Sequence, residues 1–519
     1  MQSVTIDGSS LDLEKVIQVA RFDTPVTIDS EAADRTLRGR KSPEKLLDEN
    51  DVIYGVNTGF GALSDQQIPR EDLKALQTNL IRSHAASVGP AHSADIVRAM
   101  MLLRANTLLK GNSGVRPDLP RTIVSLLNKR VHPYIPEKGS VGASGDLSPL
   151  SHMALVLMGE GKAEYKRRWV PGLQGLKIGG CKPLSLEAKE GLALNNGTQQ
   201  MLAIGCLGLH DAYDLLATAV AALALSLEAM GGWVDAFDLR IHALRPHPGQ
   251  KKVAAEVLAL LEKSRKVRTT VGNRVDKGRP QDPYSFRCAP QVMGAVRDAM
   301  DFVRRTLEVE MNSATDNPLV FPKDKVCLSG GNFHGQPVSM AMDILSLAVS
   351  TMGNISERRT AALLDPSLNN GLPAFLVGKG SHPGLSSGFM AVQYTATALV
   401  AENKTLTHPA SSDSIPTSSN FEDFVSMGPG AAQKAARVVE NAQYVIAIEL
   451  LAAAQAVDLR GSGGLGRGTG KVHRLIRSRV PPVSEDRSSH EDIEAVREMV
   501  RKGLVSDIVR RELLKAVEK

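Results

Sequence analysis

Long apolar stretches set the second half of the chain apart from the first. From about Leu202, Ala/Leu-rich segments recur that exceed the usual length of a globular helix, at residues 210–231, 291–312, 338–364, 386–406 and 430–459. Their apolar positions cover more than one narrow stripe, so we expect helices buried on several sides, in a large bundle or a subunit interface. The first 200 residues instead mix short helices with irregular Gly- and Pro-containing segments.

This pattern predicts a mainly α fold, with an irregular N-terminal domain followed by a long-helix bundle. We expect the N-terminal domain over residues 1–201, the central bundle over 202–480 and peripheral helices over 481–519. In the last part, Ser488 and Glu491 have the spacing of a capping box before an amphipathic helix. Composition agrees, because hydrophobic residues make up 42% and aromatic residues only 4%, which favours helices over strands.

Charge and cysteine content indicate the class of protein. The chain has 62 basic and 56 acidic residues, a net charge of +6, which is too small an excess for a nucleic-acid-binding surface. The longest uncharged apolar run, residues 215–227, is shorter than the roughly 20 residues that span a bilayer. Four widely spaced cysteines favour reduced thiols, and the first residues lack the pattern of a secretory signal. We expect a cytoplasmic protein with neither nucleic-acid nor membrane partners.

Common cofactor and metal motifs are missing from the sequence. GSGGLG at 461–466 fits the dinucleotide pattern, but it follows a predicted helix and not the strand that such a site requires. The twelve histidines show no HExxH spacing, and no Cys/His cluster appears, so no metal is predicted. A serine hydrolase would need a G-x-S-x-G motif, which is also missing.

The segment GSVGASGDLSPLSHMAL, residues 139–155, is the most distinctive in the chain. A Gly/Ser loop that leads into a helix would explain Asp146 or Ser148 as a cap and Pro149 in the first turn. That interpretation leaves the Ala-Ser-Gly core of the segment unexplained.

The Ala-Ser-Gly core resembles the aromatic amino-acid lyase family, whose members cyclise such a tripeptide into a methylidene-imidazolone (MIO). The resemblance implies that the Gly145 nitrogen attacks the Ala143 carbonyl, which requires a tight bend that glycine permits. Ser144 then loses its hydroxyl as water and leaves a methylidene. The cofactor would therefore be an electrophile formed from Ala143, Ser144 and Gly145, with no external cofactor.

Four further motifs resemble the family in the same order along the chain. They are YGVNTGFG (54–61), LALNNGTQ (192–199), QDPYSFRC (281–288) and GGNFHGQP (330–337). The resemblance implies that Tyr54 and Tyr284 are catalytic. It also implies a substrate-binding set of Asn196, Gln281, Arg287 and Phe333. In this family the active sites are shared between the subunits of a homotetramer, so a homotetramer is expected.

Three positions point to histidine as the amino-acid substrate. Ser83-His84 and Glu422 resemble the histidine-specific members of the family, and His334 stands where phenylalanine and tyrosine lyases usually have Gln. Physically, a buried imidazole needs polar partners, and His84 and Glu422 would supply them, whereas a phenyl ring would leave the carboxylate desolvated and unpaired. Phe421 and Phe424 depart from the residues usual in histidine-specific members, Gln and His, and they make this wall more apolar. Tyrosine or phenylalanine ammonia-lyase and 2,3-aminomutase activities therefore remain alternatives.

The predicted reaction is elimination of the α-amino group of L-histidine to give urocanate and ammonia, a step of histidine catabolism. Arg287 would hold the substrate carboxylate by a bidentate pair. Tyr54 is the expected base for the β-proton, which requires a phenol ionised well below its usual pKa of about 10. Glu422 would be a ring anchor or itself the base, and both roles stay open. A helical scaffold without catalytic activity is the remaining alternative.

Overall fold

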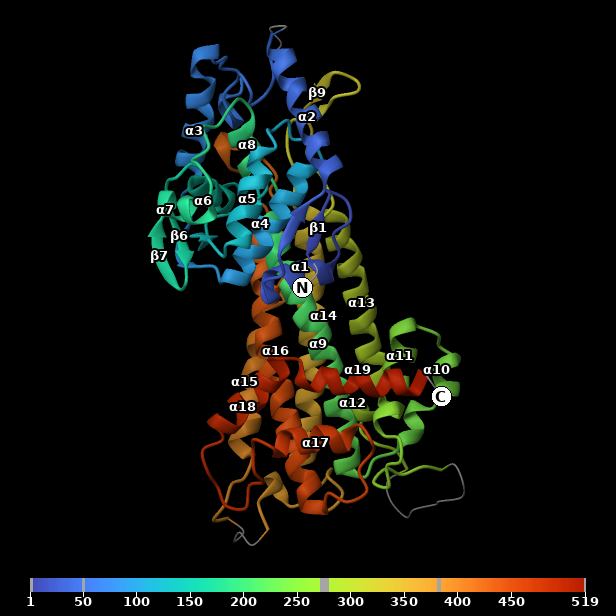
Figure 1. The fold of residues 1–519 in the computed structure, drawn as a ribbon. Coiled ribbons are helices and arrows are strands. Elements are labelled where there is room, and N and C mark those ends of the chain that lie inside the picture. Colours follow the sequence, from blue (N-terminus) through green and yellow to red (C-terminus); the bar gives the residue numbers. More distant parts are fainter. Residues whose placement is uncertain (1–2, 49–51, 271–279, 380–383, 518–519) are drawn as a thin grey trace. The chain divides into compact units, whose positions relative to one another are not determined.

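The computed structural model describes residues 3–48, 52–270, 280–379 and 384–517 (Figure 1). Contacts within the chain group these residues into two compact units, each built from three segments. Unit 1 comprises residues 1–207, 303–343 and 409–433, and unit 2 comprises 208–302, 344–408 and 434–519. The first boundary lies close to the predicted one at 201. Residues 303–343 and 409–433, which the sequence assigned to the central bundle, group with unit 1.

Unit 1 holds short helices and all the strands that the described residues contain. Its helix α4 (Ala94–Leu109) is buried on nearly every side and packs against α1 (Leu13–Phe22) and α5 (Asp118–Asn128) (Figure 1). The other helices of this unit are α2 (Ser30–Asp48), α3 (Leu73–His84), α6 (Leu147–Leu157), α7 (Gly172–Gly179) and α8 (Glu190–Asn195). Buried apolar side chains on α4 and its neighbours thus form the core beneath the irregular loops.

The strands of unit 1 are short and pair in four small sheets. β1 (Val4–Ile6) and β2 (Val26–Ile28) pair in parallel, with Val4 opposite Val26. The antiparallel sheets are β3 (Val88–Ala91) with β5 (Pro136–Lys138), β4 (His132–Pro133) with β6 (Lys162–Tyr165) and β7 (Arg168–Pro171), and β8 (Leu319–Phe321) with β9 (Val326–Leu328). None of them is large enough to form a core, so the predicted mainly α class is confirmed for the described chain.

The long helices match the predicted segments closely. They are α9 (Gln199–Met230), α13 (Ala289–Glu310), α14 (Gln336–Leu364), α15 (Met390–Leu406) and α16 (Gly428–Arg460). Three of them, α9, α14 and α16, are long and apolar enough to cross a membrane, by length and composition only. From the sequence, only one such segment had been considered, the apolar run at 215–227. Packing inside the protein already buries 83%, 67% and 83% of their most apolar windows.

Unit 2 carries an ion pair within its helical core. Arg359 on α14 and Glu449 on α16 are fully buried, and two guanidinium nitrogens donate to the two carboxylate oxygens at 2.6 Å each. Ser226 and Ser356 donate to the same carboxylate. The smaller helices of the unit are α10 (Leu239–Ala243), α11 (Pro248–Leu260), α12 (Tyr284–Arg287), α17 (Thr469–Arg477), α18 (His490–Arg501) and α19 (Leu504–Val517).

The predicted capping box is wrong. Helix α18 begins at His490, and its N-cap is Ser489, which makes no side-chain hydrogen bond to the helix. Ser488 therefore lies one residue before the cap. The helix is nevertheless amphipathic as expected, with Val496, Met499 and Val500 buried.

Candidate active site

A pocket of about 730 Å³ in unit 1 contains four of the predicted site residues. Tyr54, His84, Ser144 and Glu422 line it, although they are spread over more than 360 residues of sequence. The remaining lining residues are Gly59, Phe60, Gly61, Ala62, Leu63, Gln66, Ile68, Leu76, Asn79, Leu80, Ser83, Leu147, Leu192, Ser418 and Ser419. The pocket thus joins the Ala-Ser-Gly segment to the side chains proposed to select the ring.

The tripeptide Ala143-Ser144-Gly145 forms a turn just before α6 and lies against the turn that joins α8 to α9. Gly145 pairs with Gly197 as an isolated parallel bridge, and the amide of Asp146 donates to the Gly197 carbonyl at 2.6 Å. The Asp146 carboxylate accepts the amides of Gln200 and Met201 at 2.8 and 3.0 Å. Asp146 therefore caps α9, and its side chain makes no cap bond to its own helix α6.

Complete burial of Asp146 raises its pKa to about 7, although the amides of Met201 and Gln200 and the hydroxyl of Ser140 lower it. A carboxyl group at this place, next to Gly145, thus titrates near neutrality. The sequence had offered Asp146 only as a cap of the helix that follows it, and the structure assigns it to the distant α9.

Asn196 reaches Ser144 directly. Its amide nitrogen Nδ2 donates to the Ser144 carbonyl oxygen at 2.8 Å and lies 3.1 Å from Ser144 Oγ. Asn196 is almost completely buried, and its Oδ1 has no hydrogen-bond partner. An unsatisfied buried acceptor is costly, and Asn196 itself is not among the residues that line the pocket.

The backbone at the tripeptide fits the ring closure that the family performs. Gly145 has φ +71°, and a Cβ added there would lie 2.6 Å from the Gly197 carbonyl carbon and 2.8 Å from the Gly197 nitrogen. Only glycine fits this conformation and this close backbone approach. The Ser144 side chain remains half-buried and lines the pocket, so a group formed at its Cβ would be accessible to a ligand.

His84 is the last residue of α3 and is half-buried. Its Nδ1 lies 2.9 Å from the Leu80 carbonyl oxygen and 3.0 Å from Ser83 Oγ. A carbonyl can only accept, so Nδ1 carries the proton and Nε2 keeps a lone pair. Burial lowers the pKa of His84 below its usual 6.5, and the Leu80 carbonyl and Glu422 act in the opposite direction. The ring is therefore neutral at pH 7.

Glu422 lies in a tight turn and not at a helix N-terminus. Thr417 and Glu422 form an antiparallel bridge, and Thr417 Oγ1 donates to Glu422 Oε2 at 2.6 Å. Within this turn, Ser418, Ser419 and Asn420 all have positive φ, from 49° to 66°. Non-glycine residues adopt this conformation only where their surroundings impose it. The strained turn leaves Oε1 of Glu422 for a ligand.

Tyr54 contradicts one expectation. Its phenol oxygen accepts the amide of Gly61 at 3.0 Å. Burial raises the pKa of Tyr54 above its usual 10.0, the Gly61 amide partly offsets this, and the charge of Glu422 raises it further. The predicted lowering of this pKa is therefore wrong for the pocket of unit 1, because no lysine or arginine is among the described residues that line it.

The remaining predicted residues do not line this pocket. Gln281, Tyr284 and Arg287 belong to unit 2, where the Arg287 guanidinium carbon lies 4.4 Å above the Tyr284 ring, an arrangement favourable for a cation–π contact. The Tyr284 side chain is 71% exposed. Phe333 belongs to unit 1 but is not among the lining residues, and it is half-buried.

Several lining residues were not singled out in the sequence. Leu76 and Leu80 precede His84 on α3 by eight and four residues, which is helical spacing, so that spacing could have placed them beside His84. Ser418 and Ser419 lie in the segment that carries Glu422, and both have the left-handed backbone of its turn, which the sequence did not indicate.

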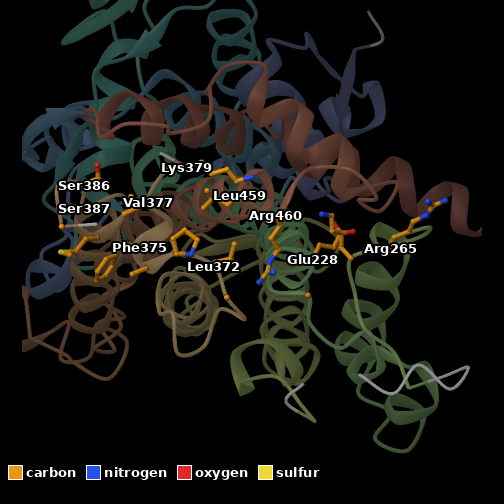
Figure 2. Close-up of a pocket in the computed structure, with 18 residues that line it drawn as sticks. Glu228, Arg265, Leu372, Phe375, Val377, Lys379, Ser386, Ser387, Leu459 and Arg460 are labelled. Carbon is orange, nitrogen blue, oxygen red and sulfur yellow. The ribbon is translucent and has the colours of Figure 1, made fainter. Parts of the chain in front are cut away.

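A second and larger pocket, of about 1040 Å³, lies in unit 2 (Figure 2). Its walls come from the ends of α9 and α16 and from residues 371–379 and 384–390, and Glu228 and Arg460 lie close to each other in it (Figure 2). None of the residues singled out in the sequence lines this pocket. Of the two pockets, only the one in unit 1 therefore contains predicted site residues, namely Tyr54, His84, Ser144 and Glu422.

The tripeptide resembles one protein family, and a comparison of the whole chain with known families gives the same family. The family model of aromatic amino acid lyases matches residues 11–478. The chain belongs to this family. Its relatives in the family include a protein from Caldanaerobacter subterraneus subsp. tengcongensis named histidine ammonia-lyase, which is 49% identical over 99% of both chains.

Solved structures of the lyase family share this fold over nearly the full length. The histidine ammonia-lyase of Trypanosoma cruzi has a TM-score of 0.90 and 42% identity, and the match covers 98% of this chain and 96% of that one. A tyrosine aminomutase from Streptomyces globisporus has a TM-score of 0.93 and 40% identity, with 98% and 99% coverage. Fold similarity alone therefore does not separate the two substrates, and the side chains in the pocket must.

Proposed function

We propose that the chain is an ammonia-lyase that converts L-histidine into urocanate and ammonia. The observation that carries the proposal is that His84 and Glu422 line the same pocket as Ser144. The family to which the chain belongs and the name of its 49% identical relative support the same reaction. The scaffold alternative is not favoured, because the residues that the reaction needs are all present.

The proposed electrophile is an MIO group made from Ala143, Ser144 and Gly145. Closure joins the Gly145 nitrogen to the Ala143 carbonyl carbon, whose oxygen leaves as one water. Ser144 loses its hydroxyl and its α-hydrogen as a second water. The group would supply a methylidene that takes up the substrate's amine and makes it a better leaving group. Asn196 fits this proposal, because its Nδ2 donates to the Ser144 carbonyl and would draw electron density from the conjugated methylidene.

Histidine is favoured by the two polar groups that would meet the ring. The neutral His84 ring presents a lone pair on Nε2, and Glu422 presents Oε1. An imidazole can give one N–H to either acceptor, and a phenyl ring can give none. With a phenyl ring in the pocket, Oε1 of Glu422 would be desolvated without a donor, which is costly. This difference is the basis of the proposed selectivity.

Tyr54 remains the proposed base for the β-proton. In the pocket of unit 1 its phenol is held protonated at neutral pH by burial and by Glu422. A cation near the phenol would lower its pKa again. Arg287 is the proposed cation, and it would also hold the substrate carboxylate as a bidentate pair.

We also propose a homotetramer in which a second copy of the chain completes the pocket with Gln281, Tyr284 and Arg287. The proposal is supported by the lack of any lysine or arginine among the described lining residues of the pocket, although the substrate carries a carboxylate. The solvent-exposed ring of Tyr284 also agrees with a contact to another copy.

Complementation tests the shared site. Ser144→Ala and Arg287→Met should each abolish activity, and chains of the two variants assembled together should regain a fraction of it. Recovery occurs only when one site takes its Ser144 and its Arg287 from different chains. Mixed assemblies as inactive as the single variants would refute the shared site.

A substrate panel tests the reaction itself. The purified protein is incubated separately with histidine, tyrosine and phenylalanine, and urocanate, coumarate, cinnamate and β-amino acids are measured. We expect urocanate from histidine at a rate well above any product of the other two. Robust turnover of tyrosine without urocanate would refute the histidine assignment and favour the lyase or aminomutase alternatives.

The cytoplasm is the proposed location. It is supported by the four cysteines, none of which forms a disulfide in the structure. Unpaired thiols are typical of reducing compartments.

A further inference from the structure

Arg104 is a fully buried arginine on α4 that contacts the turn holding Asn196. Its Nη1 donates to the Asn196 carbonyl oxygen and to Gln199 Oε1, both at 2.9 Å, and its Nη2 donates to the Ala193 carbonyl oxygen. One planar guanidinium therefore connects the end of α8, the turn and the start of α9.

The turn is shaped around this guanidinium. A Cβ at Gly197 would collide with Arg104 Nη1, so the residue after Asn196 must be glycine for the arginine to fit. Gly197 itself accepts the Asp146 amide and pairs with Gly145. Arg104 thus contacts the same turn, at Asn196 and Gly197, that contacts the tripeptide.

Arg104 is charged at pH 7 despite its burial. Burial lowers its pKa to about 10, and the charge of Asp316 partly offsets this. The hydrogen bonds of a charged donor are about twice as strong as neutral ones. A lysine in its place would keep the charge but could not reach three acceptors with a fixed planar fork.

We propose that Arg104 is a positioning residue for the reaction, which sets the Asn196 amide against the carbonyl of Ser144. This inference rests on the proposed function, because it matters only if Ser144 becomes the electrophile. Arg104 acts through Asn196, whose Nδ2 lies 2.8 Å from the Ser144 oxygen, and no hydrogen bond joins Arg104 to a lining residue of the pocket.

A matched control lies on the same helix. Arg98 is also buried on α4, 3% exposed, and also donates to main-chain oxygens, those of Val19 and Leu127. Those oxygens belong to α1 and α5 or their ends and lie away from the Asn196 turn in the sequence. Arg98→Met therefore reports the effect of losing a buried guanidinium from α4 without loosening Asn196.

The test compares Arg104→Met and Arg104→Lys with Arg98→Met in the full-length protein. We measure intact mass, thermal unfolding, kcat and KM. A small displacement of a catalytic group can lower kcat by about 100-fold, and we expect such a loss for Arg104→Met, a smaller loss for Arg104→Lys and KM values within about threefold of wild type. We expect the intact mass of Arg104→Met to show incomplete loss of two waters, and that of Arg98→Met complete loss.

A double-mutant cycle keeps the test decisive if Arg104→Met does not fold. Arg104→Lys is combined with Asn196→Ala, and the effect of the lysine on kcat is measured in both backgrounds. If Arg104 acts through Asn196, the lysine lowers kcat in the wild type and changes it little in Asn196→Ala. Equal effects in both backgrounds, or complete dehydration with unchanged kcat in a folded Arg104 variant, would overturn the proposal. A wild-type protein of full mass without turnover would instead overturn the proposed function.

Discussion

Replacement of Glu422 by leucine separates ring recognition from the chemistry that is common to all substrates. One carboxylate oxygen, Oε2, already accepts the hydroxyl of Thr417 at 2.6 Å. The other oxygen, Oε1, can accept the imidazole N–H, so in Glu422→Leu the substrate loses one hydrogen bond to a charged group. Such a bond contributes about 1.5–3 kcal/mol, which corresponds to about a 10- to 150-fold lower kcat/KM for histidine at about 1.4 kcal/mol per tenfold.

The same replacement should not harm a substrate with a phenyl ring. Phenylalanine cannot donate to Glu422, and removal of this carboxylate makes the wall of the pocket more apolar. We therefore expect kcat/KM for phenylalanine to stay constant or rise, and Glu422→Gln to give an intermediate loss for histidine. If phenylalanine turns over too slowly, inhibition by urocanate and by cinnamate gives the same comparison.

The assay follows urocanate by its ultraviolet absorbance at several histidine concentrations. Asp423→Asn is the control, because Asp423 is the next carboxylate in the chain and is exposed outside the pocket. We expect it to behave as wild type. An equal loss for histidine and phenylalanine in Glu422→Leu would refute the ring-anchor role and favour Glu422 as the base. Unchanged kinetics for both substrates would refute both roles.

Three further predictions concern maturation and stability. Gly145→Ala should prevent the loss of two waters, as measured by intact mass. Gly180→Ala is the control and should mature fully, because Gly180 has a similar φ of +72° but open space around it. A dehydrated Gly145→Ala chain would contradict the backbone argument. Burial lowers the pKa of His92 from 6.5 to about 4. Between these pH values the unfolded chain binds more protons than the folded one. The free energy of unfolding should therefore fall by up to about 3 kcal/mol as the pH drops from 6.5 to 4. Urea titrations of His92→Gln should show a flatter pH dependence than wild type, and an unchanged slope would contradict this. Glu449→Leu leaves Arg359 buried and unpaired and should destabilise the protein by about 3–5 kcal/mol in thermal unfolding. The control is Glu440→Leu, which removes a half-exposed ion pair and should cost less than about 1 kcal/mol, and equal shifts for the two variants would contradict the prediction.

Much of the fold follows from the apolar pattern of the sequence. The segments expected at 291–312, 338–364 and 430–459 became α13, α14 and α16 with ends within two residues. Helix α9 begins eleven residues before the expected 210, because the polar Asn-Gly-Thr-Gln stretch is capped from outside by Asp146. Such a cap comes from a residue more than fifty positions away, and a local pattern cannot reveal it.

The residues of the candidate site could be predicted where they belong to sequence motifs. They could not be predicted where their role depends on tertiary contacts. Ser144, Tyr54, His84 and Glu422 come from motifs and share one pocket. Arg104 carried no signal, because a buried arginine within a helix has the same local sequence as one that faces water. The raised pKa of Tyr54 was also unforeseen, since it depends on burial and on a carboxylate distant in sequence.

The tryptic peptide Gly139–Lys162 carries the whole Ala-Ser-Gly segment, and its mass tests the central claim most directly. The proposed chemistry requires that this peptide from the purified protein be lighter than its sequence by two waters. The Ser144→Ala side chain has no hydroxyl to lose, so the same peptide from this variant should not show the two-water loss. A wild-type peptide at its full sequence mass, from a preparation that turns over histidine, would contradict the claim that the chain builds its own electrophile.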